Sequence, residues 1–337
     1  MRRPRSSVAV AVLGSAVVAV AALAQPPLAS AQRVGAPYRI GVLNDARAAN
    51  HPAADGLKAG LREAGLQEGR DVVFDVKLTY GSSERMLAAA AAVAKSGADV
   101  IFTSGEAATL AAKVATPNIP VVFTLVGDPM AAGVVKSLAQ PEANVTGVSS
   151  LTTDLVPKRL EALKILAPWL RRVWAVSHGV DPTSRAALAR ALEVAPRFGI
   201  EVAPRDIGTQ QDLDQFLESL RPGDALRPGD ALLVPDIATL DIAAVLLETS
   251  LARRIPAVFS SELWVNHGGL VSYGADYRAQ GVQGARLVWK ILRGTAPRDL
   301  PVEGAERVIL AVNLKTAEAF GLAAPRQILF RADVIRR

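Results

Sequence analysis

The sequence predicts an α/β protein with two doubly wound, Rossmann-like lobes around a hinged cleft. One observation is the alternation of short apolar runs with amphipathic stretches, which is typical of strands and helices that build parallel sheets. A second is an internal repeat, because three segments of the first half recur in the same order in the second half. A third is the lack of a Gly/Ser linker between the halves, which indicates that the chain passes between the lobes several times. The repeated pairs are 39–43 with 172–176, 99–102 with 230–234, and 119–123 with 255–259, at offsets of 133, 131 and 136 residues.

The first half alternates strand and helix patterns. Residues 52–64 predict a helix with one apolar face, because apolar residues recur at i, i+4 and i+7. The Ala-rich residues 82–95 predict a second helix, with a serine cap before it and a glycine after it. A third helix opens at residues 104–106. The strands are expected at 38–43, 71–78, 100–103, 119–123 and 144–149.

The second half repeats the pattern. Its helices are expected at 157–166, 184–194 and 212–220, and a further helix follows residues 235–236 and ends at about 253. Its strands are expected at 173–176, 201–205, 230–234, 255–259 and 268–274. Residues 277–292 predict a helix that returns to the first lobe, and a strand at 308–312 with a helix at 314–320 closes the chain. The predicted first lobe is therefore 36–150 with about 275–300, and the predicted second lobe is 151–274 with about 301–337.

A short tandem duplication lies inside the second half. The six residues 221–226 are repeated as 227–232. Because both copies begin with a Pro-Gly turn signal, we interpret the first copy as an inserted surface loop.

Residues 1–31 have the pattern of an export signal. Arginines precede an apolar stretch at 8–24, and the sequence ASA at 29–31 fits a cleavage site of the A-x-A type. We predict cleavage after Ala31, with Ala24 as the second choice; an uncleaved membrane anchor is the alternative, although the apolar run is short for spanning a bilayer. The chain has no cysteine, which excludes disulfides and lipid attachment through cysteine. The mature protein is expected to be a free monomer in the periplasm.

Charge and motifs argue against nucleic-acid binding and against catalysis. The formal charge of +6 falls to +3 when the three arginines of the leader are subtracted, and both signs are interleaved, so no nucleic-acid partner is predicted. No G-x-G-x-x-G follows the first strand, and neither a Walker loop nor a G-x-S-x-G elbow occurs. His51, His178 and His267 lie on separate expected loops without metal-ligand spacing. No catalytic residue, metal or cofactor is predicted.

Polar residues follow the expected strands in both lobes. Ligands of open α/β sheets bind outside the carboxyl ends of the strands, so these residues are predicted to line the cleft. Hydroxyls and the N–H groups of helix starts suit a carboxylate, and Asp236 or Glu106 suits an amine, so an amino acid or a similar small zwitterion fits best. Two alternatives stay open: Glu106 as an ordinary acid in a first helical turn, and His178 as an exposed or capping residue. The predicted ligand-binding residues are Asn44, Asp45, Ser104, Gly105, Glu106, Thr124, Asp128, Ser177, His178, Asp236, Ser261 and Glu262.

Several stretches resemble a known family. They are residues 119–138, 144–151, 268–277, 290–303 and 312–322. They are similar to the periplasmic substrate-binding proteins of ABC importers, in the group associated with tryptophan and other aromatic amino acids, and the similarity spans about 38–337. The resemblance implies the type I periplasmic binding protein fold, closure of two lobes on a small ligand, and delivery of that ligand to an importer permease in the inner membrane. Gly105-Glu106 departs from the family, where relatives often have Thr-Pro.

Two other functions are compatible with the same residues. An exported α/β hydrolase or transferase would convert the ligand that it binds. A ligand-sensing module for a membrane partner would bind the ligand in the same way as a transport receptor.

Overall fold

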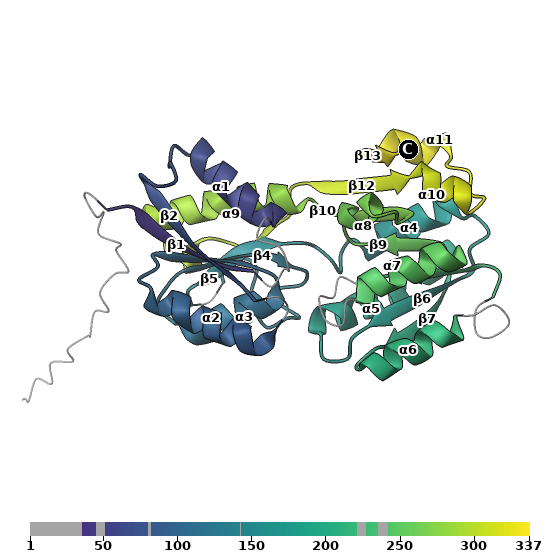
Figure 1. Cartoon of the computed structure of the whole chain (residues 1–337), viewed down its shortest axis with the longest axis horizontal. Coiled ribbons are helices and arrows are strands. Elements are labelled where there is room, and N and C mark those ends of the chain that lie inside the picture. Colours follow the sequence, from purple (N-terminus) through teal and green to yellow (C-terminus); the bar gives the residue numbers. More distant parts are fainter. Residues whose placement is uncertain (1–35, 45–50, 80–81, 142, 221–226, 235–241) are drawn as a thin grey trace, which may run out of the picture.

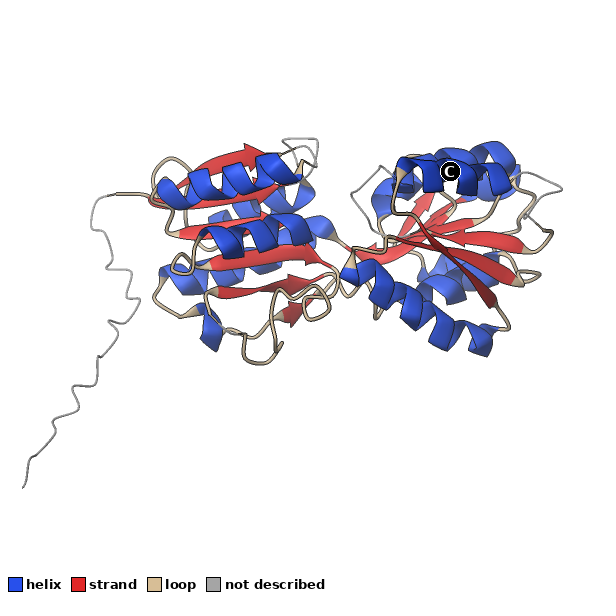
Figure 2. Ribbon diagram, turned by 90° about the horizontal axis from the view of Figure 1, so that it is seen from below, coloured by secondary structure: helices blue, strands red, loops and turns tan. Residues whose placement is uncertain are grey.

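The computed structural model describes residues 36–44, 51–79, 82–141, 143–220, 227–234 and 242–337. It consists of two lobes side by side, each with a sheet between helices (Figure 1), and a view from below shows the same two bodies joined at a narrow waist (Figure 2). The leader, the first copy of the tandem duplication, and the predicted site residues Asp45 and Asp236 lie outside the described residues.

The first lobe is built on a six-stranded sheet with the order β11-β5-β4-β3-β1-β2. All of its pairings are parallel. Strands β3 and β5 are buried along their whole length, as is usual in a parallel sheet that has helices on both faces. The strands are β1 (Tyr38–Asn44), β2 (Val72–Leu78), β3 (Val100–Ser104), β4 (Val121–Val126), β5 (Val145–Ser149) and β11 (Glu303–Gly304).

The second lobe has a seven-stranded sheet with the order β13-β12-β10-β9-β8-β6-β7. Its pairings are parallel except for that of β10 with β12, so β12 and β13 run opposite to the other five strands. The strands are β6 (Arg172–Ser177), β7 (Glu201–Asp206), β8 (Asp230–Leu233), β9 (Ala257–Phe259), β10 (Val271–Ala275), β12 (Val308–Asn313) and β13 (Val334–Arg336).

The two sheets share one strand order. The run β5-β4-β3-β1-β2 of the first sheet corresponds, strand by strand, to β10-β9-β8-β6-β7 of the second. The three repeated sequence segments form β1 and β6, β3 and β8, and β4 and β9. The prediction of two similar doubly wound halves is confirmed by this topology.

The first lobe has helices on both faces of its sheet. Helices α1 (Pro52–Glu63) and α9 (Tyr277–Leu292) cover one face, and α2 (Ser83–Lys95) and α3 (Glu106–Ala115) cover the other. Helices α1 and α9 touch through glycine: a Cβ added at Gly56 would lie 2.1 Å from the carbonyl oxygen of Arg278. A distant part of the chain is thereby packed into the first lobe.

The second lobe has the same layers. Helices α4 (Val156–Leu166) and α5 (Pro182–Val194) pack on one face with α10 (Leu314–Ala319) and α11 (Arg326–Arg331). Helices α6 (Gln210–Ser219) and α7 (Ile242–Arg253) pack on the other. The short α8 (Glu262–Asn266) follows β9.

The chain crosses between the lobes three times, from β5 to α4, from β10 to α9 and from β11 to β12. The crossings are tied to one another, because the Asp276 N–H donates to the Arg307 carbonyl (3.0 Å) and the Ala305 N–H donates to the Ser149 carbonyl (2.9 Å). Leu151, in the first crossing, has a positive φ of 57°.

Some elements differ from the expectation. The two residues of β11 pair with β5, so the chain stays in the first sheet to Gly304, beyond the boundary expected near 301. Strand β4 continues to Val126, so Thr124 lies within the strand and not in the loop after it. Helices α8 and α11 and strand β13 were not expected; each is too short to give a periodic pattern.

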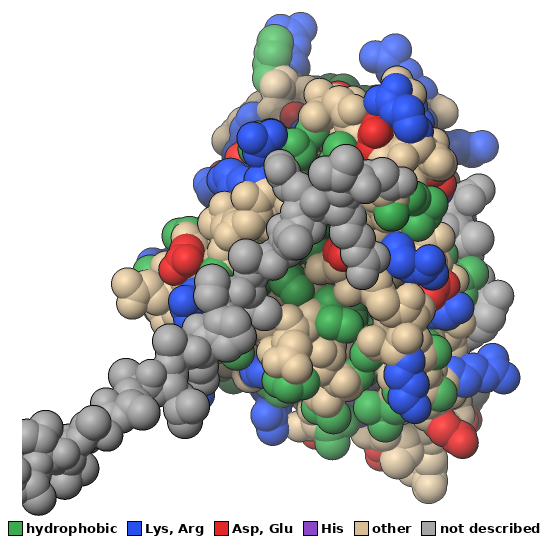
Figure 3. Space-filling model, turned by 90° about the vertical axis from the view of Figure 1, so that its left-hand side faces the viewer, with side chains coloured by type: hydrophobic (Ala, Val, Ile, Leu, Met, Phe, Trp, Pro, Cys, Tyr) green, Lys and Arg blue, Asp and Glu red, His purple; other side chains and the backbone are tan. Residues whose placement is uncertain are grey.

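The outer surface is mixed in charge. Lys and Arg side chains are interspersed with Asp and Glu side chains on the end of the first lobe (Figure 3).

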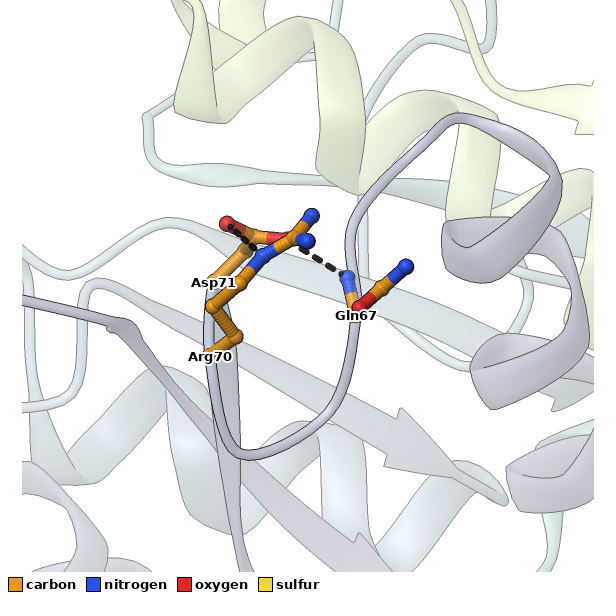
Figure 4. A network of polar contacts seen from close by, with 3 residues as sticks. All are labelled: Gln67, Arg70 and Asp71. Carbon is orange, nitrogen blue, oxygen red and sulfur yellow. Dashed lines mark hydrogen bonds and ion pairs between the residues drawn. The ribbon is translucent and has the colours of Figure 1, made fainter.

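The turn before β2 is fixed by an acidic residue. The carboxylate of Asp71 accepts from the Gln67 N–H (2.8 Å) and from Arg70 (2.7 Å), as Figure 4 shows. These two hydrogen bonds hold the pKa of Asp71 below its usual value, and the bond from Arg70 has the larger effect.

Candidate ligand-binding cleft

Three polar residues end neighbouring strands of the first sheet on one face. The strand register pairs Asn44 with Ser104 and Ser104 with Thr124. Because side chains alternate along a strand, all three lie on the face of Val42 and Phe102, which is covered by α9. All three are buried. The predicted residues Asn44, Ser104 and Thr124 are therefore brought together at the carboxyl edge of the first sheet.

Helix α3 begins at the same edge. Its N-cap is Gly105, whose φ of 97° is a left-handed conformation that glycine adopts without strain. The Gly105 N–H donates to the Thr124 carbonyl (2.9 Å), which holds the start of α3 against β4. The next residue, Glu106, is thereby directed away from the sheet and toward the second lobe.

Glu106 makes a direct contact between the lobes. Its Oε2 accepts a hydrogen bond from Oγ1 of Thr183, in the first turn of α5, at 2.9 Å. Burial raises the pKa of Glu106; the bond from Thr183 opposes this rise, and the charges of Asp181 and Asp128 add to it. The contact thus joins one acid of the first lobe to a second-lobe helix whose own cap, Asp181, is also acidic.

The lobes also meet at Gly127, in the loop after β4. A Cβ added there would lie 2.5 Å from Cγ2 of Thr183 and 2.7 Å from Oγ1 of Thr152 in the first crossing. Only a residue without a side chain allows this approach. Gly127 therefore belongs to the inner end of the cleft, next to the hinge.

The second lobe presents Ser177 and His178 at the end of β6. Both are buried. The backbone of His178 is fixed by Ser184, whose Oγ accepts from its N–H (3.0 Å) and donates to its carbonyl (3.1 Å). Nδ1 of His178 has no hydrogen-bond partner within the described part of the chain. The alternative of an exposed histidine is therefore wrong, and a ring nitrogen is available at the edge of the second sheet.

The other predicted residues have local roles in the structure. The Thr124 hydroxyl donates to the Thr103 carbonyl (3.1 Å), and Oδ1 of Asp128 accepts from the Ala131 N–H (3.0 Å). Ser261 caps α8 by accepting from the Leu263 N–H (3.3 Å), and Glu262 is the first residue of that helix. These bonds occupy groups that were expected to face a ligand.

Sequence reasoning missed two residues at the cleft. Gln280, in α9, accepts from the Leu125 N–H (3.2 Å) and from the Ser150 hydroxyl (3.2 Å) through Oε1. Arg159, in α4, is buried and donates to the Thr152 carbonyl (3.0 Å) and to the Tyr273 carbonyl (2.8 Å). Gln280 and its partners, like Arg159 and Tyr273, are more than 100 residues apart in the chain, so no local pattern marks these contacts.

A small cavity adjoins Arg159 in the wall of the second lobe. Its volume is about 20 Å³, and its polar lining comes from Thr152, Arg159, Thr183 and Ser184. It has room for water but not for an amino acid. This cavity is therefore not the binding site of an amino acid.

Two other kinds of site are absent from the described residues. Within the ranges that the structure describes, no three His, Asp or Glu side chains come together as possible metal ligands. In the same ranges, no helix has the length and apolar character to cross a membrane.

The comparison with protein families is decisive. The family model described as ABC transporter substrate binding protein matches residues 44–335. This chain belongs to that family. Members of the ABC transporter substrate-binding family are binding proteins and not enzymes, so the hydrolase or transferase alternative is excluded.

Individual relatives of this substrate-binding protein agree with the assignment. The tyrosine-binding protein of Clostridioides difficile (strain R20291) is 26% identical over 276 residues, covering 81% of this chain and 78% of the relative. A conserved domain protein of Vibrio cholerae O1 biovar El Tor has a TM-score of 0.79 at 26% identity, covering 89% of this chain and all of the other. The ABC domain of Streptococcus pneumoniae in complex with L-Trp has a TM-score of 0.80 at 23% identity, with the same coverage, and shows the fold. The expected type I periplasmic binding protein fold is confirmed.

Proposed function

We propose that this protein is a periplasmic receptor that binds a small ligand, an amino acid, between its lobes and delivers it to the permease of an ABC importer. The hydrogen bond from Thr183 to Glu106 is the observation that carries the proposal. It joins the carboxyl edge of the first sheet to a helix of the second lobe, so the polar strand ends of both lobes face one space.

The chemistry of that space suits a zwitterion. Glu106, with Asp181 and Asp128 nearby, provides negative charge for an ammonium group. The buried hydroxyl of Ser104, at the end of β3, suits a carboxylate. The relative from Clostridioides difficile is named a tyrosine-binding protein and the structure from Streptococcus pneumoniae is in complex with L-Trp, which supports an amino acid with an aromatic side chain. Asp236, the other candidate for the ammonium, stays a prediction.

Titration calorimetry of the mature protein with L-tyrosine and L-tryptophan tests this function. We expect one of them to bind with a micromolar or lower Kd, and mass spectrometry should recover it unchanged. D-glucose and L-aspartate are the controls. A protein that binds neither aromatic amino acid, or that binds all four probes alike, would refute the proposed ligand class.

Export and delivery need separate measurements. We expect the protein purified from the periplasmic fraction to begin at Gln32, after cleavage following Ala31. Deleting the receptor should abolish uptake of the bound amino acid by cells that depend on it. Retention of the full-length chain in the membrane fraction would contradict cleavage, and unchanged uptake would contradict the transport role.

A further inference from the structure

Two buried donors at the end of the first sheet have no acceptor among the described residues. They are Nε2 of Gln280 and the hydroxyl of Ser104. Gln280 is 1% exposed and Ser104 is fully buried. A donor shielded from water and left without an acceptor lowers stability, so a fold that keeps two of them at one end of the same sheet needs a reason.

The orientation of the Gln280 amide is fixed by its neighbours. Its other atom, Oε1, lies 3.2 Å from the Leu125 nitrogen and 3.2 Å from the Ser150 hydroxyl. Because a backbone N–H can only donate, the atom facing Leu125 must be the oxygen. The NH₂ group is therefore directed away from these two partners.

Gln280 and Ser104 lie at the same place in the lobe. The β3–β4 register pairs Ser104 with Thr124, the residue before Leu125. One turn further along α9, a Cβ added at Gly284 would be 2.9 Å from Phe102 and 3.2 Å from Thr124. Gln280 is thus over the ends of β3 and β4, on the face to which Ser104 points.

A lone buried hydroxyl would not be enough to indicate a site. Ser272, inside β10, also has a fully buried hydroxyl without a partner in the described ranges, and it lies within the sheet. An amide whose oxygen is held by two donors is different, since it cannot rotate its nitrogen toward another acceptor. The conjunction of this amide with the Ser104 hydroxyl is what distinguishes the end of the first sheet.

We propose that Gln280 and Ser104 hold the carboxylate of the ligand. This inference rests on the proposed function and adds which end of the ligand the first lobe recognises. A carboxylate has two oxygens and only accepts hydrogen bonds, so it matches two adjacent donors. Ser104 is two residues before Glu106, and the carboxylate and ammonium of an α-amino acid are separated by a single carbon. In this assignment the ligand carboxylate contacts the donors at the ends of β3 and β4, and its ammonium contacts Glu106 at the start of α3.

The test compares L-tyrosine with tyramine, which has the ammonium and the ring but no carboxylate. In the unaltered protein we expect tyramine to bind at least tenfold more weakly. Gln280→Glu keeps the acceptor for Leu125 and Ser150 but replaces the NH₂ group with a carboxylate oxygen, so the Kd for L-tyrosine should rise roughly 10- to 100-fold while that for tyramine does not rise. Ser104→Ala should raise the Kd for L-tyrosine about 3- to 10-fold. Should Gln280→Glu fail to fold by circular dichroism, Ser104→Ala decides.

Ser272→Ala is the matched control, because it removes an equally buried, unpartnered hydroxyl and should leave both Kd values unchanged. Equal binding of L-tyrosine and tyramine, or unaltered L-tyrosine binding in both first-lobe variants, would overturn the carboxylate assignment and leave the proposed function standing. If the unaltered protein binds neither L-tyrosine nor L-tryptophan, the proposed function fails, and this inference fails with it. The same series with L-tryptophan and tryptamine applies if only L-tryptophan binds.

Discussion

A carboxylate held near two other acids, as Glu106 is near Asp181 and Asp128, is less stable in its charged form than a free one. The hydrogen bond from Thr183 offsets only part of this effect. The ammonium group of a ligand next to Glu106 would instead stabilise the charged form of this carboxylate. Glu106 is therefore suited to release a proton when an amine binds.

Affinity should depend on pH through this residue. Burial, with Asp181 and Asp128, raises the pKa of Glu106 in the free protein, and an adjacent ammonium would lower it again. Affinity for L-tyrosine should accordingly increase as pH rises from about 5 to 6.5, above the ordinary glutamate pKa of about 4.3. Glu106→Gln should bind about 2 kcal/mol more weakly and lose this dependence. Calorimetry at both pH values, with the exposed Glu63→Gln as control, measures it; the same pH dependence in Glu106→Gln would remove Glu106 from the site.

Asp230 illustrates a charged residue with a purely structural role. Its carboxylate accepts from Arg172 (2.9 Å), from the indole N–H of Trp174 (3.0 Å) and from the Arg227 N–H (2.9 Å). Burial acts to raise its pKa, but these three bonds outweigh burial and hold the pKa below the usual value. The stabilisation is therefore present at neutral pH and is lost as pH falls through this lowered pKa.

Asp230→Asn should lower the free energy of unfolding by about 2–4 kcal/mol at pH 7, because it weakens a bonded ion pair in a buried position. The deficit should shrink in acid, because the stabilisation from the charged carboxylate begins to be lost once the pH falls below the usual aspartate pKa. Urea unfolding at pH 7 and pH 3 gives both values. An equal deficit at the two pH values would show that the charge of Asp230 is not what stabilises the fold.

At the scale of elements, the packing of α1 on α9 depends on glycine. The Cβ of Gly56→Ala would lie 2.1 Å from the Arg278 carbonyl oxygen, and that backbone atom cannot move without shifting α9. We expect a loss of about 1–3 kcal/mol in the free energy of unfolding. Gly208→Ala is the control, since its Cβ would meet nothing closer than 3.6 Å. Chemical denaturation compares the two, and equal stabilities would mean that the helices adjust at little cost.

Elements with long patterns were predictable, and contacts between distant elements were not. The strand runs and the helices with apolar stripes follow from local sequence, and the repeat fixed their equivalence in the two lobes. Strand β11 has only two residues, so its pairing with β5 has no sequence pattern. Gln280 is 155 residues from Leu125, and only the return of α9 to the first lobe brings them together. Thr124 was misplaced because β4 continues past the residue where its apolar run ends.

At the scale of the whole molecule, Gly127 should determine how far the lobes can close. A side chain there would collide with Thr183 and Thr152. Gly127→Val should therefore raise the Kd for L-tyrosine about tenfold or more while each lobe keeps its fold, because ligand bound to a single lobe loses the contacts of the other. Small-angle scattering should show a smaller radius of gyration on ligand binding in the unaltered protein and a smaller change in the variant. Identical scattering with and without ligand in the unaltered protein would contradict closure.

The three crossings between the lobes also bear on how the chain is made. Because α9 completes the core of the first lobe, that lobe cannot be finished until residue 292 has been synthesised, long after its first strand has emerged. Nascent chains that stop at residue 276 should therefore remain protease-sensitive, whereas the full chain should become resistant. Contacts between segments so far apart also form slowly. The export proposed above requires a chain that is still unfolded when it reaches the membrane, and the discontinuous first lobe favours this because its core is completed late.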